Sequence, residues 1–175
     1  MKKFSARGQR TLKIIHLVTA CLWLGGAAAI NLMILWLGPG ESGPELVGYD
    51  LARKFIDDLV LIPGAMGCLL SGLLICWLTP WGFFRHRWVA VKWVLTVACI
   101  LFGTFYMGPR LNGQHLISQE LGLAAVSDPL YVANRFHNIL GGVVQVLSLL
   151  FLVVISVLKP WKKKAAPKIP AGQEG

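Results

Sequence analysis

Four long apolar runs constrain the fold of this chain more than any other feature. They cover residues 12–37, 59–84, 88–108 and 130–158. A helix rises about 1.5 Å per residue, so about 20 apolar residues cross a hydrocarbon layer ~30 Å thick. The first run has no formal charge after Lys13, and it is too long and too rich in Trp and Gly for a signal peptide. We therefore predict an all-α fold, an integral membrane four-helix transmembrane bundle.

The composition agrees with this class. Hydrophobic residues make up 55% of the chain and charged residues only 14%, with a mean hydropathy of +0.63. The net charge of +9 does not indicate nucleic-acid binding, because the basic residues flank the apolar runs. All four cysteines lie inside apolar runs, so a disulfide framework of the secreted kind is not expected.

The distribution of charge predicts the orientation. Basic residues gather in the N-terminal segment, the connection between runs two and three, and the tail: Lys2, Lys3, Arg7, Arg10, Lys13, Arg85, Arg87, Lys159, Lys162, Lys163, Lys164 and Lys168. The other two connections hold seven of the eight acids. The positive-inside rule then places both termini in the cytoplasm of a bacterial inner membrane. We predict one transmembrane domain over residues 1–164 and a disordered cytoplasmic tail over 165–175, whose neighbouring lysines lie on the anionic leaflet.

The two outer connections have helical character of their own. Residues 44–58 form an amphipathic pattern leading into the second run, and residues 113–123 suit another short helix. Ser127-Asp128-Pro129 is a good helix start for the fourth span. Ridges of small residues predict close packing between helices. They comprise Gly25, Gly26, Ala29, Gly64, Gly67, Ser71, Gly72, Gly141 and Gly142.

Two helices have polar stripes at helical spacing. The third run has Lys92, Thr96, Cys99, Gly103 and Tyr106, and the fourth has Asn134, Asn138, Gly141, Gln145 and Ser148. Such stripes are either hydrogen-bonding contacts between helices or the lining of a ligand or proton path.

His16 and Lys92 are expected at the same depth, about one turn inside the cytoplasmic interface. One interpretation makes His16 a haem-iron ligand and Lys92 the partner of a haem propionate or a substrate carboxylate. The alternatives are an interfacial histidine bonded to a carbonyl and a lysine that reaches the headgroups. Trp23 follows His16 on one face of the same helix and is a further candidate for cofactor binding.

The other histidines are placed differently. His137 is expected near the opposite surface, too far from His16 for both to bind one iron. His86 and His115 are expected in solvated loops.

Charged residues near the outer surface form a second candidate site, made of Asp57, Asp58, Arg110 and Arg135. They fit either an ion-pair cluster or an entry site for cations. The cysteines and Met66 could bind copper(I) as soft ligands, although no CxxC or MxxM spacing supports this. No catalytic motif is found, so no catalytic residue is assigned.

Two short motifs resemble known families. Lys13-Ile14-Ile15-His16 with Trp23-Leu24-Gly25-Gly26 resembles the first helix of small bacterial four-helix membrane proteins. These include the copper-resistance D type, the membrane-bound protoporphyrinogen oxidase type, which binds haem b, and integral membrane families of unknown function. Arg87-Trp88-Val89-Ala90-Val91-Lys92 is similar to a Trp-x-x-x-Lys segment of the oxidase type. Residues 62–65 and 107–110 depart from the oxidase, so the nearest match overall is a family of unknown function.

The resemblance implies functional roles for His16 and Lys92 only. The leading hypothesis is a redox-associated protein that binds haem b or a porphyrin. Two alternatives remain: a non-enzymatic component for copper or ion handling, and an assembly partner of other membrane proteins or of its own copies.

Overall fold

The computed structural model describes residues 5–78, 83 and 86–160, and the regular structure in these segments is helical. Four segments are long and apolar enough to cross a membrane, as predicted. Their elements in chain order are α1 (Ala6–Trp36), α2 (Gly43–Ile56), η1 (Asp57–Leu61), α3 (Ile62–Leu78), α4 (Arg87–Phe102), η2 (Gly103–Met107), α5 (Gly108–Leu121), η3 (Gly122–Ser127) and α6 (Pro129–Leu158). The predicted tail and the end of the second apolar run lie outside the described residues.

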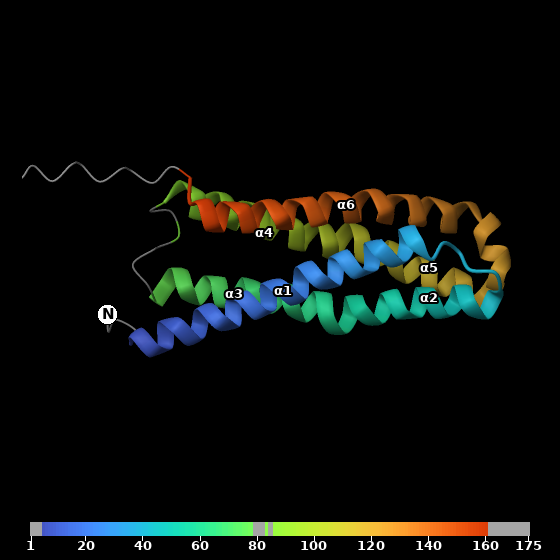
Figure 1. The fold of residues 1–175 in the computed structure, drawn as a ribbon. Helices are drawn as coiled ribbons and strands as arrows, with labels where there is room; N and C mark the ends of the chain where they lie inside the picture. The colour runs from blue at the N-terminus through green and yellow to red at the C-terminus, as the bar shows by residue number, and fades with distance from the viewer. Residues whose placement is uncertain (1–4, 79–82, 84–85, 161–175) are drawn as a thin grey trace, which may run out of the picture.

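The second and third spans are longer than the apolar runs that predicted them. The amphipathic segment from Gly43 continues through η1 into α3 without a break, and α4 continues through η2 into α5. The helical pair formed by α2 and α5, together with η3, projects beyond the end of α1 (Figure 1). We call this projecting part the cap. The first turn of α1 and the last turn of α6 lie at the opposite end.

Two π-helical segments interrupt these long helices, and each is closely followed by a proline. Pro63 comes two residues after η1, and Pro109 comes two residues after η2. A proline inside a helix lacks an N–H and clashes with the carbonyl four residues earlier. A π turn, which bonds to the fifth preceding residue, widens the helix and accommodates this clash. Sequence reasoning expected only a bend at Pro63.

Capping residues set where the helices begin. Ser5 accepts a hydrogen bond from the backbone N–H of Gly8 at the start of α1. The Asp128 carboxylate accepts one from the N–H of Tyr131, with Pro129 at the first position of α6. The predicted start of the fourth span near Pro129 is therefore confirmed.

Small residues let the helices pack closely, as the ridges predicted. Gly64 lies against the backbone of Trp23, Gly67 against Thr19, and Gly142 against the Asn31 side chain. Gly25 is an exception, since no atom lies within 4 Å of the position that a Cβ would occupy there. The main core joins α1, α3, α4 and α6 around Trp23, while the outer faces of the spans expose leucine, isoleucine and valine, as lipid contact requires.

Candidate functional site

A cavity of about 330 Å³ lies inside the bundle, on the side of the membrane where the cap stands. All four spans contribute to its wall, with Trp23 and Asn31 from α1, Asp57 from η1, Thr104 from η2 and Gln145 from α6. Its volume falls at the lower end of the ~300–1,000 Å³ typical of small-molecule sites. This cavity is the candidate functional site.

Both π-helical segments form part of the cavity wall. Asp57, Asp58 and Leu61 come from η1, and Gly103 and Thr104 from η2. π turns are wider than α turns and often occur at functional sites. The two prolines, which favour these π turns, therefore affect the shape of the cavity. They place the irregular parts of two neighbouring spans around the same space.

Three buried residues of the wall have polar atoms without a partner. These atoms are Nε1 of Trp23, Oδ1 of Asn31 and Oε1 of Gln145. The side chains are 2%, 9% and 5% exposed, respectively. Asn31 uses its Nδ2 to donate to the Ala27 carbonyl at 2.8 Å, which leaves only its oxygen unsatisfied. An unsatisfied buried polar atom costs about 1–3 kcal/mol, so a guest or water that bonds these three atoms would be stabilised in the cavity.

The charged groups of the wall are both acidic. Asp58 pairs with Lys54, with 2.6 Å between Oδ2 and Nζ. Asp57 is half-buried, and among the described residues no donor bonds its carboxylate. No lysine, arginine or histidine in the described part of the chain belongs to the wall. The cavity is therefore suited to a group that is positively charged or donates hydrogen bonds.

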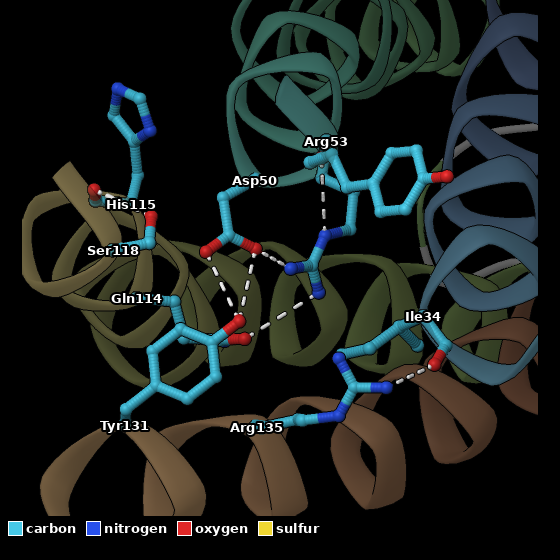
Figure 2. A network of polar contacts seen from close by, with 9 residues as sticks. Ile34, Asp50, Arg53, Gln114, His115, Ser118, Tyr131 and Arg135 are labelled. Atoms are coloured by element: carbon cyan, nitrogen blue, oxygen red, sulfur yellow. Dashed lines mark hydrogen bonds and ion pairs between the residues drawn. The ribbon is translucent and has the colours of Figure 1, made fainter. Parts of the chain in front are cut away.

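A buried polar network holds the cap together beside the cavity (Figure 2). Asp50 and Arg53 of α2 form an ion pair, with side chains only 1% and 2% exposed. Tyr131 of α6 donates to Asp50 Oδ2 at 3.1 Å, and Arg53 donates to Gln114 Oε1 of α5 at 3.5 Å. The network joins three helices and balances one buried charge with another.

Asn138 connects this network to the cavity wall. With its amide oriented to satisfy its neighbours, it accepts from Gln114 Nε2 at 2.6 Å and from the N–H of Leu111 at 3.1 Å. In the same orientation it donates to the Met107 carbonyl at 3.3 Å. Asn138, Leu111 and Met107 all line the cavity, so this amide bonds the cap to the site, in addition to the Lys54–Asp58 pair. Sequence reasoning missed this network, although Asp50 and Arg53 at i,i+3 on an amphipathic helix were a signal for it.

For Asp57, Asp58, Arg110 and Arg135 the sequence allows either an ion-pair cluster or an entry site for cations. Within the described residues, no ion pair joins either acid to either arginine. Arg110 lies over the Tyr106 ring at 3.7 Å and donates to the Tyr106 carbonyl, while Arg135 donates to the Ile34 carbonyl at 2.7 Å. Each arginine is thus bonded to a backbone carbonyl, and the two acids are in the cavity wall instead.

The histidines are distributed along the bundle. The Tyr106 hydroxyl and His137 Nδ1 share a hydrogen bond of 2.9 Å, in the half of the bundle that adjoins the cap. His115 was expected in a solvated loop, which is wrong: it lies in α5 and is 7% exposed, because the helix extends past the apolar run. In Figure 2 its imidazole lies apart from the Asp50 network. His86 is the N-cap residue of α4 and stacks on Trp88.

His16 lies in the other half, against α3. The Ser71 hydroxyl donates to the Gly67 carbonyl at 2.6 Å, so the N–H at Nδ1 of His16 donates to Ser71 Oγ at 2.9 Å and to the Cys68 carbonyl at 3.1 Å. This tautomer leaves a lone pair on Nε2. Lys92 is within electrostatic range of His16 and Cys68, which agrees with the shared depth predicted for the two basic residues.

The described residues contain no group of three or more His, Cys, Asp or Glu side chains placed to hold a metal ion. Among the cysteines, Cys68, Cys76 and Cys99 are buried and Cys21 is exposed on the outer face of α1. A haem iron needs only one protein ligand from each side, so this finding does not bear on His16.

Four apolar spans with apolar outer faces, packed around a mostly apolar cavity with a few polar groups, define a polytopic integral membrane protein. The chain belongs to the family described as "Predicted integral membrane protein (DUF2269)", whose sequence profile matches residues 10–160. Comparison with curated proteins gives no match, and comparison with solved structures gives none either.

Proposed function

We propose that this integral membrane protein handles a small cation, which it binds in the cavity between η1 and η2. The observation that supports this most directly is the unpaired Asp57 carboxylate in a wall without basic side chains. The unpartnered oxygens of Asn31 and Gln145 add two acceptors beside it. A half-buried carboxylate and buried carbonyl oxygens favour a positively charged guest, because each is stabilised by the charge it receives.

The orientation expected from the basic residues makes this cavity accessible from outside the cell. With both termini in the cytoplasm of a bacterial inner membrane, the cap stands on the outer surface. The cavity then lies in the outer half of the bilayer, directly below the cap. A cation arriving from outside would meet Asp58, which is exposed and paired with Lys54, before Asp57.

Binding to protein purified in detergent tests the proposal. We expect at least one member of a panel of metal chlorides and alkylammonium chlorides to raise the unfolding temperature of the wild type. Asp57→Asn should abolish the shift, because it removes the free charge and keeps the shape. Glu120→Gln, which removes an exposed acid of α5 away from the cavity, should retain it. The proposal fails if no cation shifts the wild type, or if Asp57→Asn responds equally.

A second candidate function is the binding of haem b or a porphyrin at His16. Its support is the fixed tautomer, since iron-ligating histidines usually donate their second ring nitrogen to a carbonyl or hydroxyl and bind through the other. Lys92, at the same depth, is suited to a propionate. Haem would supply redox chemistry in this half of the bundle, with His16 as its axial ligand and Lys92 as its anion partner.

A further inference from the structure

The wall of the cavity has two chemically different regions. Gly26 packs against Leu61, and the two helices run antiparallel. Asp57 is one turn before Leu61, on the side of the cap, so it lies level with the turn of α1 that ends at Asn31. Gly142 packs directly on Asn31, which brings α6 and its Gln145 to nearly the same level. The acceptors thus gather towards the cap. Deeper in the bundle the wall is apolar, with Ala65 and Ile100 beside the indole of Trp23.

A wall with one polar and one apolar region does not suit a metal ion that has lost its hydration water. Hard cations such as Mg²⁺ and Ca²⁺ take six or more oxygen ligands, often from several carboxylates. The wall has two carboxylates, and Lys54 occupies one of them. Within the described segments no group of three or more metal-ligating side chains is found. An ion stripped of its water would also face the apolar region, at a high desolvation cost.

A protonated amine with an alkyl chain matches both regions. Its N–H groups are donors, as the Asp57 carboxylate and the unpartnered oxygens of Asn31 and Gln145 require. Its chain can lie in the apolar region against Ala65 and Ile100, where burial of each CH₂ is favourable. The Trp23 N–H needs an acceptor, which a hydroxyl on the guest or a co-bound water can supply.

We propose that the cavity binds an alkylammonium ion, with the ammonium group at Asp57, Asn31 and Gln145 and the alkyl chain towards Trp23. This inference rests on the proposed function, since it names the class of cation. All exposed residues of the wall belong to the second and third spans: Asp58, Ile62, Met66, Thr104, Pro109 and Asn112. The guest therefore enters between η1 and η2.

Hexylammonium is the probe for this proposal, and hexanol is its neutral counterpart of equal chain length. Thermal unfolding of the full-length protein in maltoside detergent should show a rise of about 5 °C at saturating hexylammonium. Hexanol should give little or no rise, although as a neutral molecule it partitions into micelles at least as strongly. Asp57→Asn should weaken hexylammonium binding by about tenfold or more, Asp57→Glu should largely retain it, and Glu120→Gln should bind like the wild type.

The outcomes separate the two proposals. If Na⁺ or Mg²⁺ stabilises the wild type through Asp57 and hexylammonium does not, the ammonium class is wrong and cation handling stands. If hexanol stabilises as well as hexylammonium, the cavity is an apolar site and the ammonium class is also wrong. If no cation stabilises the protein, both proposals fail. The comparison of hexylammonium with hexanol needs only the wild type, so it decides the question even if Asp57→Asn does not fold.

Discussion

At the scale of single residues, the cap depends on charges that are almost fully removed from water. Arg53 and Asp50 are paired in the interior, and Tyr131 and Gln114 complete their hydrogen bonds. A buried ion pair adds little stability compared with apolar residues of the same size, but the loss of one partner leaves an uncompensated charge. The two side chains should therefore tolerate joint replacement better than single replacement.

Arg53→Met tests this coupling. The substitution leaves Asp50 buried with only the Tyr131 hydroxyl as partner, so we expect a loss of ~3–5 kcal/mol in the free energy of unfolding. SDS titration of protein in mixed micelles measures the change. The double variant Asp50→Leu with Arg53→Met should be clearly more stable than Arg53→Met alone. Equal or lower stability of the double variant would contradict the coupling.

Haem binding at His16 is tested by absorption spectroscopy. Protein reconstituted with haem in detergent should show a Soret band that His16→Ala removes, since no neighbouring side chain can replace the Nε2 ligand. His137→Ala is the matched control, because that imidazole is hydrogen-bonded to Tyr106 in the opposite half and its loss should leave the band unchanged. Lys92→Met should weaken binding without removing the ligand. A band lost with His137→Ala and kept with His16→Ala would exclude the assignment.

At the scale of elements, apolar length predicted the spans, and small residues predicted how they pack. The extension of the second and third spans into the cap could not be measured from apolar runs, because α2 and α5 contain charged and polar residues, such as Asp50 and Gln114, that interrupt the apolar pattern. The π segments follow from prolines, but a proline alone does not distinguish a bend from a π turn. Of the candidate site residues, Trp23, Asp57 and Asp58 meet in one cavity. Arg110 and Arg135 are not part of the cavity wall, because each donates a hydrogen bond to a backbone carbonyl.

Gly64 offers a test of the predicted ridge on α3. A Cβ at this position would lie 2.6 Å from the backbone N of Trp23, so Gly64→Ala must push α1 and α3 apart. We expect a loss of ~1–3 kcal/mol, typical of overpacking, in the same SDS titration. Gly25→Ala is the control, since no atom lies within 4 Å of its added Cβ and alanine favours the helix. Similar stability of both variants would show that α1 and α3 are not in close contact at Gly64.

At the scale of the whole molecule, the bundle is asymmetric, and its two halves contain different candidate sites. The half that contains the start of α1 and the end of α6 has His16 within electrostatic range of Lys92, and the other half has the cavity with its cap. Asn138 bonds the cap to the cavity wall, so a disturbance of the Asp50–Arg53 pair would be felt at the site. Which half faces the cytoplasm therefore decides from which side a ligand reaches each site.

Reporter fusions determine this orientation. Four spans place both chain ends on one side, and the excess of lysine and arginine near those ends predicts that this side is the cytoplasm. A reporter that is active only in the cytoplasm should be active when it is fused after Lys164. A reporter that is active only in the periplasm should be active when it is inserted between Gly38 and Gly43. The insertion site follows the end of α1 and precedes α2, so it should leave both helices intact. The reverse activity at both sites would place the cavity towards the cytoplasm, and a cation bound at Asp57 would then come from inside the cell.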